Sequence, residues 1–545
     1  MPGLENRRSM RSIIIAVWFL LIISAPAATP ELGKSKLRRL VKLPSMIFPS
    51  DWTFDPERGF RVGSHGGDIE AQIIQLRKEL ENDASDADRY RSLGALYGEI
   101  NEPARAQSAR WRAIQLLRKR SELQPDNAAV LADLGLTLEE AGKSEEAESI
   151  LRRAVQVGPQ EWKGWLALGR FLDQESRRDI LERARVPVDV KSVSRQLPGA
   201  TQLAPDRLAL AQKRLEESVA CYDSAATNAP NEPEIRVRRA LHRTLQSFLM
   251  NEIREASGEH KTETEILSGY FSPETIEDLR VASDLRPKDY HLMANLALFE
   301  IYGINARSGK RGLGPDSSWT ALPDNSQESL RTIITRLENL AQDPDTRVAA
   351  GALEILGILQ GPVLHESNNA LKSLQRSLAL DPTREQAWEL ASGTLARSAN
   401  YEGLLTLCEE RIRTEDNPRA HLLLAKAYEK LKRWEDAEAE VLIVVQKGPN
   451  DFLGNLSLAA LLLHRAQDPD TLAEAAGWLQ RCDKIFNSLT AQQKSRQLVI
   501  DFTLIRAIFM ALEDQVETAR QWVTNVIEND KENELAKEIL SAMAY

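Results

Sequence analysis

The spacing of small residues in one short stretch limits most strongly what this chain can fold into. Residues 131–159, LADLGLTLEEAGKSEEAESILRRAVQVGP, read as two amphipathic helices, because leucines recur at steps of three and four residues. Gly135, Ala147 and Ala154 nevertheless occupy positions where larger side chains would bury more apolar surface. Small side chains there permit neighbouring helices to approach closely, so the stretch predicts a helical hairpin that packs against another hairpin.

The same offsets recur along the chain. In WKGWLALGRFL, Trp165, Leu168 and Gly169 stand 34 residues after Leu131, Leu134 and Gly135. The stretches ADRYRSLGALYGE and RAHLLLAKAYEKLKRWEDAEAEVLIVVQKGP carry the same pattern. Self-similarity at a period of roughly 20 to 50 residues is the signature of repeat architectures. The residues that we assign to repeat packing are Gly94, Gly135, Ala147, Ala154, Pro159, Trp165, Gly169, Trp388, Tyr428 and Ala437.

In these residues the chain resembles the tetratricopeptide repeat (TPR) family, whose unit of about 34 residues is a helix–turn–helix. The resemblance extends over residues 68–543 and is clearest at 87–172 and 385–449. It implies an all-α fold, a right-handed α-solenoid of stacked helix–turn–helix repeats with about ten helix pairs and a capping helix. In this family the first helices of the pairs line a concave groove that holds peptides or folded proteins.

Composition and periodicity divide the chain into five parts. They are a signal peptide or anchor at 1–27, a basic and then Pro/Gly-rich linker at 28–67, N-terminal repeats at 68–230 with a long insertion at 175–212, degenerate repeats at 231–383 with loops at 257–273 and 305–327, and C-terminal repeats with a cap at 384–545. Loops of this length are usually either functional or disordered, and the sequence leaves both interpretations open.

The N-terminal segment indicates export or membrane attachment. A basic flank precedes the apolar run 13–23, and small residues end at Ala27, which is the layout of a secretory signal peptide. An uncleaved anchor is the alternative, because the uncharged span 12–30 approaches the length of about 20 residues that crosses a bilayer. The cations at 34–42 would then hold the body on the cytoplasmic side. We therefore expect an exported, periplasmic or otherwise extracytoplasmic protein, or one associated with a membrane through 12–30.

The charge of the chain disfavours nucleic acid as a partner. The first 45 residues carry eight Lys or Arg and two Glu, whereas the whole chain has a net charge of −10. The remaining body is therefore acidic and repels phosphate backbones. Cys221, Cys408 and Cys482 are too far apart to form a disulfide framework or a metal-binding pair, and we interpret them as small core residues.

The motifs of common enzymes and metal sites are missing from the sequence. It contains no nucleophile elbow, no HExxH zinc motif and no phosphate-binding loop. The glycine-rich SGKRGLG at 308–314 follows no apolar strand, and His65 with Asp68 is too small a ligand set for a metal. Asp345 and Asp470 lie in two DPDT sequences without the rest of a calcium loop, so we expect them at helix N-caps or in first turns. We expect neither catalysis nor a cofactor.

Six residues are predicted to face the groove from the first helices of the pairs. They are Arg91, Lys163, Arg170, Asp173, Lys426 and Leu456. Some members of the family bind chaperone C-termini through a Lys/Asn/Arg clamp. That clamp is disfavoured in this chain, because no repeat with a clear pattern has Asn at the corresponding position. The residues found there are Ala95, Leu136, Arg170, Gly393 and Lys426.

These observations lead to one functional expectation and two alternatives. We expect a non-catalytic protein–protein interaction scaffold or adaptor of the cell envelope or the secretory pathway, whose groove binds peptide or protein partners. The first alternative is a membrane-anchored docking or import receptor. The second is a glycan-binding or lipid-binding accessory subunit of an envelope enzyme.

Overall fold

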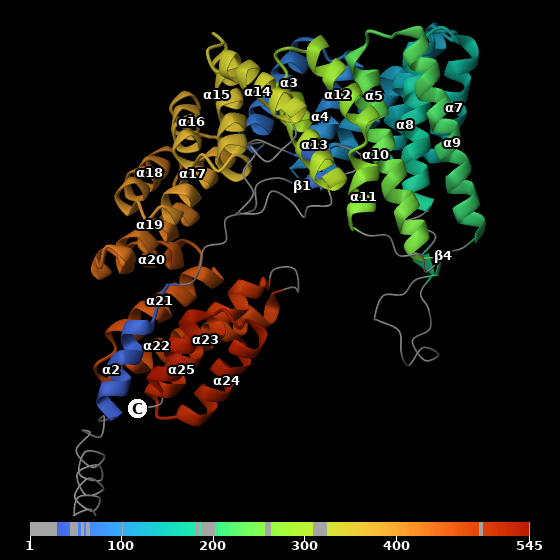
Figure 1. Ribbon diagram of the computed structural model, residues 1–545. Coiled ribbons are helices and arrows are strands. Elements are labelled where there is room, and N and C mark those ends of the chain that lie inside the picture. The colour runs from blue at the N-terminus through green and yellow to red at the C-terminus, as the bar shows by residue number, and fades with distance from the viewer. Residues whose placement is uncertain are drawn as a thin grey trace, which may run out of the picture. The chain divides into compact units, whose positions relative to one another are not determined.

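The chain folds into stacked pairs of α-helices. The computed structural model describes residues 30–43, 53–55, 59–61, 66–100, 102–179, 185–186, 202–203, 205–256, 263–308, 324–489 and 494–543. It divides into two compact units, which we call the C-terminal unit (Met1–Phe48 with Leu395–Tyr545) and the central unit (Pro49–Thr394). The predicted all-α repeat fold is confirmed (Figure 1).

The central unit consists of consecutive antiparallel helices. They are α3 (Gly66–Asn82), α4 (Ala87–Glu99), α5 (Pro103–Leu123), α6 (Ala128–Glu140), α7 (Ser144–Val157), α8 (Trp162–Arg178), α9 (Pro205–Asn228), α10 (Pro233–Ala256), α11 (Glu263–Tyr270), α12 (Pro273–Leu285), α13 (Tyr290–Ser308), α14 (Asp324–Leu340), α15 (Thr346–Ile358), α16 (Ser367–Leu380) and most of α17 (Glu385–Arg397). The pairs α4–α5, α6–α7, α8–α9 and α15–α16 pack most extensively, as expected for helix–turn–helix repeats.

The C-terminal unit continues the pattern. It contains α18 (Tyr401–Thr414), α19 (Pro418–Lys430), α20 (Trp434–Lys447), α21 (Phe452–Arg465), α22 (Pro469–Ser488), α23 (Arg496–Leu512), α24 (Val516–Asn529) and the capping helix α25 (Glu534–Ala542). One further helix, α2 (Pro30–Leu40), comes from the other end of the chain and lies against α21, α23 and α25 (Figure 1, blue).

Short polar side chains fix where many first helices begin. Asn127 accepts a hydrogen bond from the backbone N–H of Val130 at the start of α6, and Asn417 does the same for Arg419 at the start of α19. Such caps satisfy amide groups that have no partner inside the helix. The prediction for the DPDT sequences is confirmed, because Asp345 caps α15 and Asp470 lies in the first turn of α22.

The small residues lie where helices approach each other most closely. A β-carbon on Gly135 would come 2.4 Å from Leu151 Cγ, and one on Gly164 would come 3.6 Å from Ala154 Cβ of the preceding hairpin. Ala147 and Ala154 are themselves fully buried. In the structure Gly135 thus lies against the facing helix of its own hairpin, and Ala154 lies against the next hairpin.

The other repeat-packing residues occupy corresponding joints. A β-carbon on Gly94 would come 2.9 Å from Arg110 Cγ, and one on Gly169 would come 3.2 Å from the Tyr222 ring. The carbonyl of Pro159 accepts hydrogen bonds from Trp165 Nε1 at 2.9 Å and from Asn228 Nδ2 at 3.0 Å. The remaining members of the set are buried, namely Trp388, Tyr428 and Ala437.

The repeat formed by α15 and α16 contains one extra residue. A β-carbon on Gly357 would come 2.4 Å from Leu374 Cγ and 3.3 Å from the Ala370 carbonyl. This alanine follows its glycine by thirteen residues, whereas the spacing in the α6–α7 hairpin is twelve. The π-helical segment η4 (Leu359–Val363) lies between them and absorbs the insertion, because a π-turn holds one more residue than an α-turn.

Two segments that we expected to be linker or loop contain regular structure. The predicted linker at 28–67 contains α2 and an antiparallel pair, β1 (Thr53–Asp55) with β2 (Gly59–Arg61). The predicted loop at 257–273 contains α11, which is only eight residues long. Both helices are too short for a repeat pattern to develop along the sequence, and each is stabilised by packing on other helices.

The remaining expectations concern insertions, cysteines and the N-terminus. Within the insertion at 175–212, β3 (Arg185–Val186) pairs with β4 (Gln202–Leu203). The prediction of core cysteines is confirmed, because all three are buried free thiols.

None of the helices in the described parts of the chain is long and apolar enough to cross a membrane. The proposed signal peptide or anchor at 1–27, His65 and most of the 305–327 loop lie outside the described residues.

Candidate functional site

The first helices of successive pairs share one face, which we call the A-face. In the central unit, Arg91 on α4 forms an ion pair with Asp133 on α6, with 2.8 Å between Nη1 and Oδ1. The pKa of Asp133 is raised, because burial outweighs the opposing effect of Arg91 and of the nearby Lys163 on α8. Two predicted groove residues are thus brought together around an aspartate that the sequence analysis did not name. Arg91 and Asp133 are 42 residues apart, so spacing within one repeat cannot reveal the pair.

Arg170 also lies among charges of neighbouring helices. Its guanidinium is near Arg238, Glu140 and Glu234, and its pKa is lowered by burial and by Arg238. Of the four predicted groove residues in the central unit, only Lys163 is exposed. Much of the charge that the sequence places on this surface is therefore neutralised by partners within the chain.

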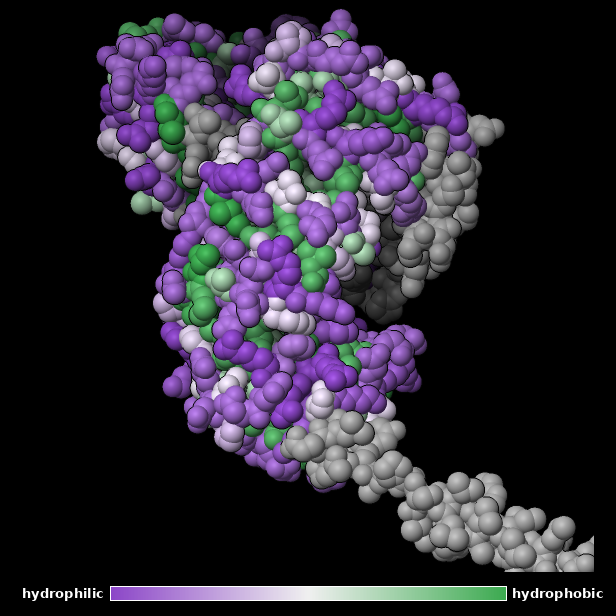
Figure 2. All heavy atoms as spheres, turned by 90° about the vertical axis from the view of Figure 1, so that its left-hand side faces the viewer, coloured by the Kyte–Doolittle hydropathy of each residue, from purple (hydrophilic) through white to green (hydrophobic). Residues whose placement is uncertain are grey.

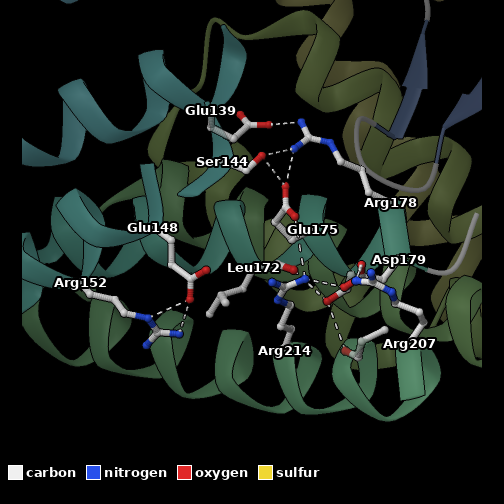
Figure 3. Close-up of polar contacts among 12 residues, drawn as sticks. Glu139, Ser144, Glu148, Arg152, Leu172, Glu175, Arg178, Asp179, Arg207 and Arg214 are labelled. Carbon is white, nitrogen blue, oxygen red and sulfur yellow. Dashed lines mark hydrogen bonds and ion pairs between the residues drawn. The ribbon is translucent and has the colours of Figure 1, made fainter. Parts of the chain in front are cut away.

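A buried ion network connects the helices next to this surface. Arg178 on α8 contacts Glu139 at 2.7 Å and also Glu175, while Arg214 on α9 contacts Asp179 (Figure 3). Glu175 and Asp179 are buried, and the arginines converge on them from two helices, as the close-up shows. Removing one partner would leave an uncompensated buried charge, so the network ties α6, α8 and α9 into one arrangement.

Asp173, a predicted groove contact, is buried inside the central unit. Tyr222 donates a hydrogen bond from its hydroxyl to Asp173 Oδ2 at 2.8 Å, and His242 Nδ1 lies 2.8 Å from Asp173 Oδ1. Ser218 Oγ lies 3.3 Å from the same ring nitrogen. A catalytic triad needs its serine and its carboxylate on opposite nitrogens of the histidine, so this group packs the core. The predicted contact between Asp173 and a partner is corrected accordingly.

A cavity of about 550 Å³ opens between α10 and α12. Arg236, Arg239 and Arg243 point to the carboxylate of Asp278, and the Arg239 contact is 2.7 Å. Burial would raise the pKa of Asp278, but hydrogen bonds from the arginines hold it below its usual value. Acidic residues are as numerous as arginines around the cavity, so its lining carries no excess charge.

The A-face of the C-terminal unit, formed by α19, α21, α23 and α25, carries a helix. That helix is α2, whose buried residues Leu37, Val41 and Leu43 face the repeats. Lys36, Arg39 and Lys42 are exposed on its other side. The segment is thus amphipathic, with an apolar side on the repeats and a basic side toward solvent.

Three polar contacts hold this segment along its length. Lys34 Nζ lies 2.7 Å from Asp514, directly after α23. His464 on α21 donates from Nδ1 to the Arg38 carbonyl at 3.0 Å. Lys426 on α19 donates from Nζ to the Leu43 carbonyl at 2.5 Å. From residue 34 to residue 43 the segment therefore passes the end of α23, then α21 and then α19, which is the reverse of the order of these helices in the sequence.

The two donors to the backbone of this segment are themselves held in place. The His464 ring stacks on Trp434 with 3.8 Å between centroids, and its pKa is lowered by burial despite the Arg38 carbonyl. Burial also lowers the pKa of Lys426, although Glu429, at 2.8 Å, favours the charged form. The His464 donor points to a carbonyl in the last turn of α2, and the Lys426 donor points to a carbonyl just beyond the helix.

The predicted groove residues of this unit have different positions. Lys426 lies on the A-face, but it contacts the chain's own residue 43. Leu456 has no exposed surface while α2 is docked, so the prediction that it contacts a partner is corrected for this arrangement of the chain. Helix α2 was not predicted from the sequence, although KLRRLVKL at 36–43 has apolar residues at helical spacing and cations between them. No group of three or more His, Cys, Asp or Glu within the described ranges could hold a metal ion.

Comparisons with known proteins give a short sequence match and similarities to solved structures. No family model matches the chain. Over 51 residues, 9% of the chain, it is 41% identical to a TPR repeat-containing protein of Dictyostelium discoideum, and the match spans 19% of that relative. Among solved structures, it is similar to yeast Tom70, with 13% identity over 88% of this chain and 92% of that chain and a TM-score of 0.31. It is also similar to a tetratricopeptide repeat protein from Parabacteroides merdae, with 16% identity over 55% and 99% and a TM-score of 0.32.

The class of the fold is defined by the chain's own packing. Paired antiparallel helices, with small residues at fixed offsets and a polar capping helix, define a stack of tetratricopeptide-type repeats.

Proposed function

We propose that this protein is a non-catalytic interaction scaffold of the cell envelope or the secretory pathway, which binds protein or peptide partners on the A-face of its repeats. The observation that supports the proposal is α2 itself. First helices of the C-terminal unit bind a helical segment through apolar contacts and through directed donors to its backbone. A surface that binds one helix in this way has the chemistry required to bind a segment of another protein.

Site-specific photo-crosslinking in native cells tests where partners bind. Lys163 on α8 is exposed and lies near Asp133 of the A-face, whereas Glu145 on the second helix α7 is equally exposed. A photoreactive residue at 163 is expected to capture partner proteins, and the same residue at 145 serves as the control. Equal capture at both positions, or none at 163, contradicts the proposed surface.

N-terminal sequencing of the mature chain tests the location. Cleavage close to Ala27 agrees with an exported scaffold and excludes the alternative of an anchored docking or import receptor. An intact N-terminus in a membrane fraction favours the receptor, because the cations at 34–42 lie shortly after the uncharged span 12–30.

A further inference from the structure

The A-face of the C-terminal unit is built to receive the end of a helix. Helix α2 ends at Leu40, the Arg38 carbonyl in its last turn accepts the Val41 N–H at 3.4 Å, and Leu43 follows just beyond the helix. His464 from α21 and Lys426 from α19 supply donors to the carbonyls of Arg38 and Leu43. These are specific complementary contacts, made from two different repeats.

The C-terminal unit and the docked segment carry net charges of opposite sign. Residues 395–545 contain 18 Lys or Arg and 24 Asp or Glu, whereas residues 30–43 contain five Lys or Arg and a single Glu. Lys34 turns toward the repeats and pairs with Asp514. The side of α2 that faces solvent is basic as well. A helix suited to this surface therefore has two or three apolar residues at i and i+4 spacing and a surplus of cations.

The docked segment is small enough to be exchanged. Its buried apolar residues are Leu37, Val41 and Leu43. Releasing α2 would therefore expose few apolar residues of the segment itself. Because α2 is covalently tethered, its effective concentration at the surface is on the order of millimolar, so it competes strongly with a free ligand.

We infer that the A-face of the C-terminal unit is a receptor for a basic amphipathic helix of a partner protein, and that α2 occupies it as an intramolecular competitor. This inference rests on the proposed scaffold function and specifies the class of partner. The partner replaces α2, and the apparent affinity for it is set by the fraction of molecules in which α2 has left the surface.

The test uses the full chain and a fluorescent peptide of residues 30–43 as the probe. In an open variant, Leu37→Asp with Val41→Asp, the charged side chains remove the apolar contacts of α2 without changing the repeats. The open variant is expected to bind the peptide at least about tenfold more tightly than the wild type does. The control variant, Arg39→Ala with Lys42→Ala, changes two exposed residues of the same helix and is expected to bind like the wild type.

A locked form provides the opposite perturbation. Lys34→Cys with Asp514→Cys, joined by a short bismaleimide, ties α2 to the repeats, and the native thiols are buried. The locked chain is expected to lose peptide binding, while the unjoined double variant keeps it. A peptide with the two aspartates is expected not to bind the open variant.

Two outcomes overturn the inference. One is an open variant that melts like the wild type yet does not bind the peptide. The other is that light scattering shows the wild type to be a dimer at the concentrations used and the open variant to be a monomer. The segment on the A-face would then come from a second copy of the chain. Neither outcome affects capture at residue 163 in the central unit, so failure of the scaffold function would be recognised separately.

Discussion

Gly135 of α6 lies so close to Leu151 of α7 that a β-carbon at residue 135 would stand 2.4 Å from the Leu151 Cγ. The leucine is fully buried, and the carbonyl of Ala147 is also near, at 3.4 Å from that β-carbon position. The glycine thus sets the distance between the two helices of the hairpin. A residue that looks unfavourable for a helix by its propensity is required by the packing of the repeat.

Replacing Gly135 with leucine is expected to destabilise the chain by about 1–3 kcal/mol, because the added side chain overpacks a closed joint. Equilibrium unfolding in urea measures the change. Gly477→Leu in α22 is the matched control, since nothing lies within 4 Å of a β-carbon there, and it is expected to stabilise by ~0.5–1 kcal/mol through helix propensity. Equal effects of the two substitutions would contradict the close approach.

Arg384 and Glu354 form a buried ion pair, with 2.6 Å between Nη1 and Oε2 and almost no exposure of either side chain. Glu354 and Tyr290 raise the pKa of Arg384, although burial opposes them. Arg384→Met is expected to cost about 3–5 kcal/mol, because the glutamate stays buried without its partner.

The control for the buried pair is Arg118→Met. Arg118 pairs with Glu146 where both side chains are nearly half exposed, so its loss is expected to cost less than about 1 kcal/mol. Adding Glu354→Gln to the Arg384→Met variant is expected to restore part of the stability, and urea unfolding of all four chains decides the matter. A larger loss for Arg118→Met than for Arg384→Met would refute the assignment.

Tyr222→Phe is expected to destabilise the central unit by about 1–3 kcal/mol, because Asp173 loses a hydrogen-bond donor while it stays buried. The same substitution in an Asp173→Asn background is expected to cost less, since the charge that requires the donor is absent. A double-mutant cycle by urea unfolding measures the coupling between the two residues. Additive effects would show that the hydroxyl does not act through Asp173.

The docking of α2 is expected to weaken as the pH falls below about 6.5, the ordinary pKa of histidine. Burial lowers the pKa of His464 in the docked state, so the released state takes up the proton first and is favoured in acid. Above pH 6.5 both states hold a neutral ring, and docking no longer depends on this group.

Hydrogen exchange of residues 34–43 measures that release. The wild type is compared at each pH with a His464→Gln variant, so that the intrinsic pH dependence of exchange cancels. We divide the protection factor of the wild type by that of the His464→Gln variant. This ratio is expected to fall between pH 7.5 and pH 5.5, with the pH dependence of a single titrating group. A constant ratio would count against the role of His464.

The repeat fold could be predicted because its determinants lie close together in the sequence. Gly135 and Ala147 are twelve residues apart, and the same offset separates Gly94 and Ala106, so one hairpin is visible within one repeat. Gly357 was overlooked because the extra residue in η4 shifts its partner by one position. A pattern with a fixed period cannot recognise an insertion that the backbone absorbs locally.

The candidate site could be predicted only in part. The position of Lys426 within its repeat predicts a groove residue, but its observed contact with Leu43 joins residues 383 positions apart. Asp173 occupies an equivalent type of slot and is buried by Tyr222 and His242 from later helices. The position of a residue within the repeat predicts which side of its helix the side chain lies on. Whether that side chain is exposed depends on which other helices pack over it.

The sequence by itself determined the class of fold, because close approach of neighbouring helices requires small residues at short and regular spacing. Only the tertiary structure decided which charges of the A-face are neutralised and that α2 occupies the C-terminal repeats. The reason is physical: ion pairs such as Arg91 with Asp133, and the seat of α2 on His464 and Lys426, join segments that meet only after the helices have stacked.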